Sequence, residues 1–196
     1  AIGELLRSWT PPPPGTWIFG TMPGTSVGIV ATQPAGNGGT LCLPPVGGFG
    51  SVYTVDPVLA AQIGCSSGAP MPFPAAVQTF EHGVMIYVGS TPAAIYVLYN
   101  NGSYSRFNDT FVDGIDQTSG GEMPPPGLIE PIRGFGKVWR SDPTVRNTLG
   151  WAIQPETGTT ATVLLFQTGQ MIALPPLGQI AVLTNVGTYR LLTGSA

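Results

Sequence analysis

Two stretches of this chain, 86 residues apart, carry nearly the same sequence. Residues 48–64 read GFGSVYTVDPVLAAQIG, and residues 134–150 read GFGKVWRSDPTVRNTLG. The register continues downstream and, after a deletion of one residue, it still relates residues 95–104 to residues 180–189. Chance does not maintain a register over such a length, so the pattern indicates a duplicated module. The fold must therefore be one that a single small unit can build twice.

Both copies predict the same local structure. Asp56 and Asp142 are N-cap candidates, each followed by a proline that suits the first helical position. Gly64 and Gly150 stand where a helix C-cap requires a left-handed residue, so each copy predicts a helix of about two turns. The β-rich runs that follow are broken by glycine turns and end in predicted hairpins. We expect a mainly β, β-rich α+β fold with two tandem antiparallel meanders and one short helix in each.

Composition divides the chain into four segments. These are a Pro/Gly-rich N-terminal arm with strand-like pieces at residues 1–45, repeat unit 1 at 46–113, a Gly/Pro linker at 114–131 and repeat unit 2 at 132–196. The arm carries many large apolar side chains but no charge after Arg7: Trp9, Trp17, Ile18, Phe19, Val27, Ile29 and Val30. We expect an extended arm that packs on its own domain or adds a strand to the sheet edge of a neighbouring copy.

The motifs GFGKVW…LGWA, F-x-x-G-x-M-I and IYVLY-x-x-G-x-Y resemble a poorly characterised tandem repeat of bacterial extracytoplasmic, cell-surface proteins. The resemblance covers about residues 46–113 and 132–192. It implies a location and a shape but no activity, because its motifs contain no catalytic residues. The second copy departs from the pattern at three positions, where Ala173, Ala181 and Thr184 replace Tyr87, Tyr96 and Tyr99.

The charged fraction is low and excludes some partners. Only 9% of the residues are Asp, Glu, Lys or Arg, against roughly 25% in typical soluble domains. Scattered basic residues outnumbered by acids exclude a nucleic-acid surface. No apolar run reaches the ~18 residues of a membrane-spanning helix. Partners, glycans or neutral polar groups must therefore cover much of the surface.

The two cysteines predict a compartment. A bond between Cys42 and Cys65 would close a loop of about 24 residues and stabilise the fold by roughly 3 kcal/mol; the alternative is two buried free thiols. Asn101 and Asn108 lie in N-glycosylation acceptor patterns, which also arise by chance. These features favour an extracellular or cell-surface location.

The chemistry-bearing residues give no catalytic constellation. GCSSG around Ser66 fits the G-x-S-x-G pattern, but it follows a predicted helix C-cap and precedes APMPFP, which cannot begin a helix promptly. His82, the sole histidine, has no candidate partner for general-base work. Asp109, Asp113 and Asp116 are spaced too widely for an EF-hand loop, which leaves a surface calcium site as a minor alternative. We expect no enzymatic activity, no cofactor and no metal.

Two functional hypotheses remain. The first is a non-enzymatic structural subunit of an extracellular bacterial surface assembly, a filament or a layer, in which the arm of one copy contacts its neighbour and the partner is the protein itself. The second is an extracellular glycan-binding module that uses Tyr87, Tyr96 and Tyr99, since exposed aromatic rings combine contact area with a polar tip. These tyrosines could instead pack beneath the arm or against the second unit.

Overall fold

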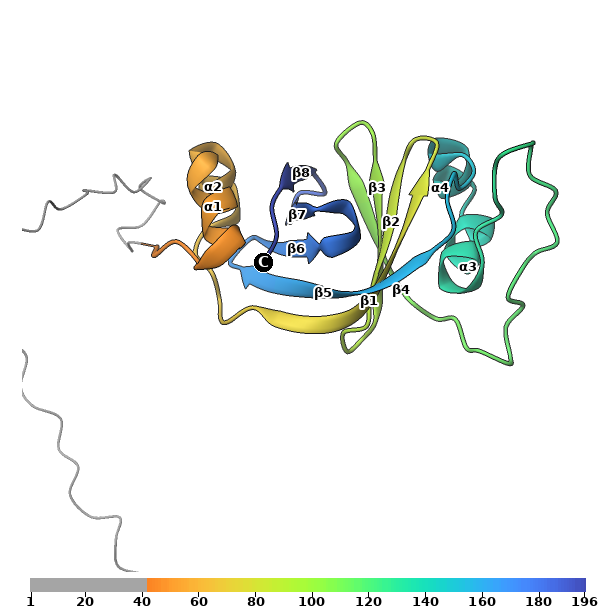
Figure 1. Ribbon diagram of the computed structural model, residues 1–196, viewed down its shortest axis with the longest axis horizontal. Coiled ribbons are helices and arrows are strands. Elements are labelled where there is room, and N and C mark those ends of the chain that lie inside the picture. Colours follow the sequence, from red (N-terminus) through yellow and green to blue (C-terminus); the bar gives the residue numbers. More distant parts are fainter. Residues whose placement is uncertain (1–41) are drawn as a thin grey trace, which may run out of the picture. The chain divides into compact units, whose positions relative to one another are not determined.

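The computed structural model describes residues 42–196, which form two matched halves (Figure 1). The first half contains α1 (Gly47–Val55), α2 (Pro57–Ile63), β1 (Met71–Phe80), β2 (Gly83–Val88), β3 (Ala94–Tyr99) and β4 (Tyr104–Asn108). The second contains α3 (Arg133–Ser141), α4 (Pro143–Leu149), β5 (Thr157–Phe166), β6 (Gly169–Leu174), the 3-10 turn η1 (Pro175–Leu177), β7 (Gln179–Thr184) and β8 (Tyr189–Thr193). The expected arm, including its apolar side chains, lies almost entirely outside the described residues.

The halves contain helices and strands of the same lengths in the same order. Helices of nine and seven residues precede strands of ten, six, six and five residues in each. Equivalent elements begin 86 residues apart as far as β2 and β6, and 85 residues apart from β3 and β7 onward. This shift coincides with the one-residue deletion in the sequence register. Among the described elements, only η1 lacks a counterpart.

All eight strands belong to one antiparallel sheet in the order β4-β3-β2-β1-β5-β6-β7-β8. The two central strands are long because each serves two neighbours: β1 pairs with β5 through residues 71–77 and with β2 through residues 75–80. Pro72 and Pro74 lie where β1 has only the β5 neighbour, so their missing amide hydrogens interrupt no second ladder. Pro74 pairs with Thr160, its own sequence equivalent, which places an approximate twofold axis at this pair.

The sheet curls until its two outer hairpins meet. Ser103 and Thr188, at the equivalent β3–β4 and β7–β8 turns, form an antiparallel bridge. The amide of Tyr104 donates to the Gly187 carbonyl, and the amide of Tyr189 donates to the Gly102 carbonyl, both at 2.9 Å. The same tyrosines each donate a hydroxyl hydrogen bond of 2.8 Å to the backbone of the opposite hairpin. The approximate twofold axis therefore relates these contacts as well as the β1–β5 pair.

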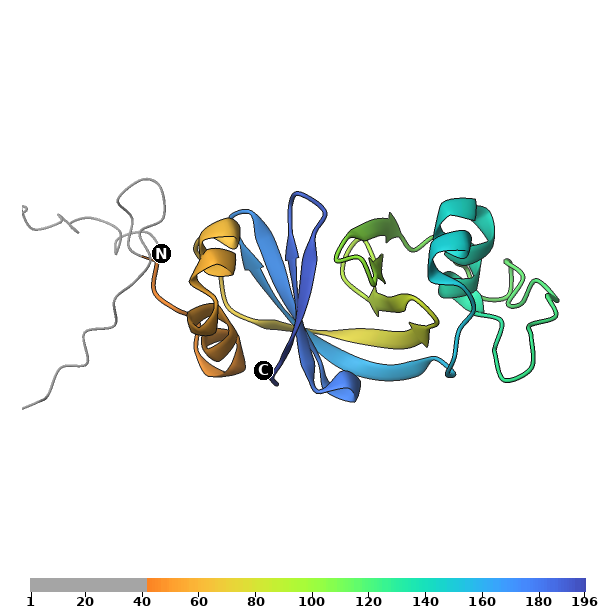
Figure 2. The ribbon, with the colours of Figure 1, turned by 90° about the horizontal axis from the view of Figure 1, so that it is seen from above.

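Each helix pair covers the strands of the other half. Residues of α1 and α2 pack on β5, β6 and β7, in a cluster of Phe49, Val52, Tyr53, Leu59, Ala60, Ile63, Leu164, Phe166, Met171, Ala173, Ile180 and Val182. Residues of α3 and α4 pack on β1, β2 and β3, in a cluster that includes Phe80, Met85, Ile95, Val97, Phe135, Trp139, Val145 and Leu149. Figures 1 and 2 show the helix pairs at opposite ends of the sheet, with β1 and β5 running between them. The inner faces of both halves share a third cluster.

Equivalent contacts hold both exchanged helix pairs. A methyl carbon of Ile63 lies 2.8 Å from where a Cβ on Gly169 would stand, and a methyl carbon of Leu149 lies 2.7 Å from the equivalent point on Gly83. The amide of Thr168 donates to the Ile63 carbonyl at 2.9 Å, as the amide of His82 does to the Leu149 carbonyl at 3.0 Å. Only glycine leaves room for these side chains, so the glycine of each β-turn receives the end of the opposite helix pair.

The predicted helix caps are confirmed. Asp56 accepts the Leu59 amide at 3.0 Å, and Asp142 accepts the Thr144 amide at 2.8 Å, each with proline at the first helical position. Gly64 and Gly150 end these helices with φ of 75° and 73°, a conformation that favours glycine.

The prediction of one helix per unit is wrong, because the glycine-rich segment before each cap is itself a helix, α1 or α3. Glycine disfavours helix, but burial of Phe49 and Tyr53, and of Phe135 and Trp139, overrides that propensity. The β-rich fold class and the antiparallel meanders are confirmed. Among residues 42–196, no helix has the length and apolarity that a membrane crossing requires.

We call the arrangement in which each helix pair covers the strands of the other half the exchange. It predicts that the two halves remain associated after the chain is cut between them. A recognition sequence for a site-specific protease can be inserted after Met123, whose side chain is 90% exposed. After cleavage, the two fragments should co-elute in native buffer, because each contributes the helices that cover the other's strands. Each fragment expressed alone should remain unfolded or aggregate. Fragments that separate and keep native circular dichroism would contradict the exchange.

Candidate assembly surface and cavities

The predicted disulfide secures the first helix pair. Cys42, just before α1, is bonded to Cys65, just after α2, with a Cα–Cα distance of 5.0 Å. Cys42 also packs against the cluster beneath these helices. The amide of Cys65 donates to Oε1 of Gln167 at 3.1 Å, which joins the same point to the second half. The bond therefore closes the two ends of the α1–α2 pair.

Removing this bond should destabilise the whole fold, because α1 and α2 cover the second half. We expect the Cys42→Ser/Cys65→Ser double variant to lose about 3 kcal/mol of unfolding free energy, measured by denaturant titration. The native protein, denatured without reductant, should show no thiol that reacts with Ellman's reagent. Two reactive thiols per chain, or an unchanged unfolding free energy, would contradict the assignment.

The second helix pair is covered by the connection between β4 and α3. Three ion pairs hold this segment on α3 and α4: Lys137 to Asp116 at 2.8 Å, Arg140 to Glu130 at 3.3 Å and Arg146 to Glu122 at 2.8 Å. The Arg146 pair is bidentate, with both guanidinium bonds at 2.8 Å. We refer to residues 112–130 as the covering segment. The predicted linker is thus bound to the helices that follow it.

A cluster of two tilted tryptophan rings and an arginine lies at the position equivalent to the disulfide. The Trp139 and Trp151 rings are 4.9 Å apart, and the guanidinium of Arg146 lies 4.3 Å from the Trp139 ring centre. Trp151 occupies the position that corresponds to Cys65. Cation–π contacts of this kind favour Arg over Lys. A covalent bond therefore secures the α1–α2 pair, whereas aromatic and cation–π contacts and ion pairs secure the α3–α4 pair.

Acid should release the covering segment. The hydrogen bond from Lys137 lowers the pKa of Asp116 below its ordinary value of 3.8, and the hydrogen bonds from Arg146 lower the pKa of Glu122 below 4.5. A lowered pKa means that each pair contributes in full above the ordinary value and is lost as the pH falls through the lowered one. Amide shifts of Gly120 and Gly121 should therefore stay constant from about pH 7 to the ordinary values and change below them.

A matched pair of variants separates this effect from general acid unfolding. Arg146→Gln removes a pair that holds the segment, whereas Arg190→Gln removes the pair with Asp56 on the other helix pair. Hydrogen exchange of residues 116–122 at neutral pH should accelerate in Arg146→Gln and remain unchanged in Arg190→Gln. Equal exchange in both variants would contradict a specific hold by the ion pairs.

The α1–α2 pair has a different surface. Asp56 is the only charged residue between residues 42 and 80, and Arg190 pairs with it. Val46, just before α1, and Val55 and Val58 on the helices are 81%, 79% and 70% exposed. No described segment covers them as residues 112–130 cover α3–α4. We call this surface of α1 and α2, where Asp56 and Arg190 form the only charged pair among the described residues, the open helix face.

The three unmatched tyrosines do not share a surface. Tyr96 is buried against the inner cluster, whereas Tyr99 and Tyr87 belong to the outer cluster beneath α3 and α4. The three side chains therefore lie on opposite faces of the sheet, so they cannot form a common sugar-stacking platform. Packing within the fold accounts for Tyr99.

The other candidate residues lie apart. Ser66 lies between α2 and β1, without the strand–turn–helix context of a nucleophile elbow, and His82 is exposed in the β1–β2 turn. Asp116 pairs with Lys137, and residues 42–196 contain no group of three His, Cys, Asp or Glu side chains placed for a metal. Asn101 and Asn108 are both exposed, at a hairpin turn and at the end of β4.

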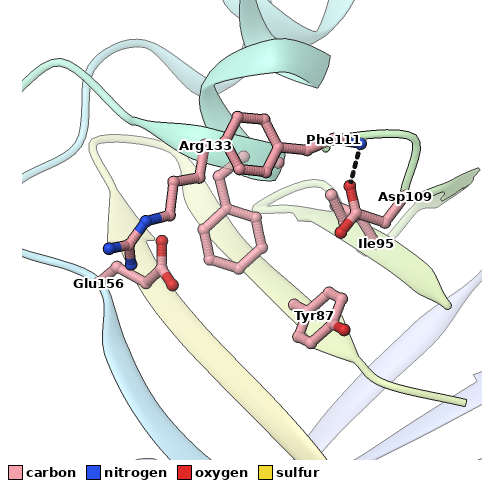
Figure 3. Close-up of a pocket in the computed structure, with 8 residues that line it drawn as sticks. Tyr87, Ile95, Asp109, Phe111, Arg133 and Glu156 are labelled. Atoms are coloured by element: carbon pink, nitrogen blue, oxygen red, sulfur yellow. Dashed lines mark hydrogen bonds between the residues drawn. The ribbon is translucent and has the colours of Figure 1, made fainter. Parts of the chain in front are cut away.

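A small cavity of about 150 Å³ lies where β4 leads toward α3. Its lining is Tyr87, Ile95, Asp109, Phe111, Arg133, Gly134, Phe135 and Glu156, most of which Figure 3 labels. Arg133 has a φ of 52°, where its equivalent is Gly47, so a non-glycine residue adopts a strained conformation there. Burial raises the pKa of Glu156, while Arg133 opposes that rise. The cavity therefore contains one basic side chain, Arg133, and two acidic ones, Asp109 and Glu156.

Two of the described arginines form no close ion pair within residues 42–196. Lys137, Arg140, Arg146 and Arg190 form ion pairs, whereas Arg133 and Arg106 do not. Arg133 lines the small cavity, and Arg106 lines a larger cleft of about 680 Å³. Sequence reasoning did not single out either arginine, although both positions differ in the matched half, where Gly47 and Leu191 stand.

Comparison with protein-family models, with curated proteins and with solved structures found no match for this chain.

Proposed function

We propose that the protein is a non-enzymatic structural subunit of an extracellular bacterial surface assembly, a filament or a layer, in which the N-terminal arm of one copy docks on the open helix face of the next. The observation that carries the proposal is the difference between the two helix pairs. A charged segment covers α3–α4 through three ion pairs, whereas the α1–α2 pair exposes Val46, Val55 and Val58 and has a single ion pair, Asp56 with Arg190.

The arm matches the open helix face in character. Residues 8–41 carry no charge and include Trp9, Trp17, Ile18 and Phe19. The α3–α4 surface is already covered by an ion-paired segment, whereas an uncharged apolar arm can remove the exposed valines of α1–α2 from water. Burial of one such side chain contributes roughly 1.5–3 kcal/mol. The character of the two surfaces therefore favours this pairing.

A neighbouring copy as acceptor accounts for the composition. A charged fraction of 9% leaves little surface to keep a free monomer soluble. Contacts from the arm of one copy to the helix face of the next are heterologous, so they propagate into a ring or an open polymer. The disulfide supports an oxidising compartment, as expected for a secreted or surface protein. The low charge and the disulfide thus support the same setting.

Val58→Glu tests the contact with little risk to the fold. Val58 is exposed in the first turn of α2, where an acidic side chain favours the helix dipole. Thr144→Glu is the matched control, because Thr144 is the exposed equivalent on α4. We expect Val58→Glu to weaken assembly tenfold or more, while Thr144→Glu assembles like the native protein. Light scattering after size exclusion and negative-stain microscopy provide the measurement.

Deletion of residues 1–35 provides the complementary test. The truncated chain retains Cys42 and the whole described fold, so it should be folded and monomeric. Mixed with the full chain, it should cap the ends of assemblies, because its helix face still accepts an arm. Polymerisation of the truncated chain would overturn the proposal. So would a full-length chain that stays monomeric at every concentration measured.

A further inference from the structure

The larger cleft opens on the inner face of the curled sheet, between strands of the two halves. The residues that line its 680 Å³ are Met71, Phe73, Val88, Ser90, Thr91, Pro92, Tyr96, Tyr104, Arg106, Val163, Leu165, Gly169, Gln170, Leu183 and Asn185. This volume falls in the range of small-molecule sites in proteins. The cleft shares none of its lining residues with the open helix face.

The lining combines an apolar wall with one positive charge. Most of the residues are aliphatic or aromatic, and none is Asp or Glu. The guanidinium of Arg106 donates to Oδ1 of Asn108 at 3.1 Å and lies 5.9 Å from the Tyr96 ring centre. Neither contact neutralises its charge. In a protein with a net charge of −3, this cleft is locally cationic and is complementary to an anion.

The matched half lacks these features. Ala181 and Leu191 occupy the positions of Tyr96 and Arg106. The β6–β7 connection contains η1, whose Leu177 packs against the inner cluster, whereas the β2–β3 connection contributes Ser90, Thr91 and Pro92 to the cleft. Since small and aliphatic residues suffice in the second half, the fold itself requires neither Tyr96 nor Arg106. The cleft is lined by both halves, but its arginine and the Tyr96 ring come from the first half alone.

The cleft lining also contains polar side chains, of which Tyr104 is already hydrogen-bonded and two others are not. The Tyr104 hydroxyl is used, because it donates to the Thr184 carbonyl at 2.8 Å. The side chains of Gln170 and Asn185 have no hydrogen-bond partner among the described residues. The cleft therefore offers a charged fork, polar groups and an apolar interior in one place.

We propose that this cleft binds a small amphipathic carboxylate, with its apolar body against Met71, Phe73 and Leu165, which line the cleft and are at least partly exposed, and its carboxylate on Arg106. A guanidinium presents two parallel donors that match the two oxygens of a carboxylate. The apolar wall selects against small hydrophilic anions, and the lone arginine selects against neutral apolar molecules. The proposal is independent of assembly, because the site lies on the inner face.

Calorimetry with decanoate and decanol tests the proposal on the full chain, below the micelle concentration of decanoate. Both probes have the same apolar body, and only decanoate is charged. We expect decanoate to bind at least tenfold more tightly than decanol. Arg106→Leu, which places the residue of the matched half there, should abolish this preference while decanol binding persists. Arg106→Lys should retain part of the preference.

Other outcomes would overturn the proposal. Equal affinity for decanoate and decanol in the native protein would remove the role of the charge. Undiminished decanoate binding by Arg106→Leu would place the site elsewhere. Binding of an oligosaccharide containing uronic acid without any binding of decanoate would assign the cleft to glycans instead. Thermal melting establishes that Arg106→Leu is folded, which is expected because Arg106 is exposed.

Discussion

The pairing of β1 with β5 is the constraint on which the rest of the structure depends. Within the described residues, these two strands form the long ladder that joins the β1–β4 and β5–β8 meanders, and the Ser103–Thr188 bridge adds a short contact between the outer hairpins. The β1–β5 pairing places the end of each half's own helix pair beside the strands of the other half. Ser66, just after α2, forms a bridge with Phe166, and Ala152, just after α4, forms the equivalent bridge with Phe80. Once β1 and β5 are paired, the helices have only the opposite outer face to cover.

The exchange makes the two halves one folding unit. Three clusters stabilise it: an inner cluster shared by both halves, and two outer clusters that each combine helices of one half with strands of the other. The two halves nevertheless differ in how their helix pairs are secured. One helix pair is closed by the Cys42–Cys65 bond and the other by the contacts of Arg146 with the Trp139 and Trp151 rings. The same divergence separates the covered helix face from the open one.

The sequence predicted local structure better than it predicted packing. Asp56, Pro57 and Gly64 identify a helix because capping is local, and the glycine turns identify the hairpins for the same reason. The helix at Gly47–Val55 was missed because its glycines oppose helix formation, and only burial against the other half reverses that. Gly50 is needed there because a Cβ would lie 2.0 Å from the Pro45 carbonyl oxygen. The exchange itself leaves no local signal, since both copies carry the same pattern whichever partner they cover.

Site prediction from the sequence met the same limit. The disulfide could be predicted from the sequence because two cysteines allow only one pairing. Tyr87, Tyr96 and Tyr99 were correctly noticed as unmatched, but their distribution over two faces of the sheet depends on strand register. The role proposed for Arg106 depends on its position beside Tyr96, its partner across the β3–β4 pair. The sequence signal that could have identified Arg106 is its replacement by Leu191 in the second copy.

Nuclear Overhauser effects between helix methyl groups and strand glycines test the exchange most directly. The structure predicts contacts from the Ile63 methyls to the α-protons of Gly169, and from the Leu149 methyls to those of Gly83. If each helix pair instead covered its own half, Ile63 would contact Gly83 and Leu149 would contact Gly169. Observation of the first pair of contacts supports the exchanged fold, and observation of the second pair would contradict it.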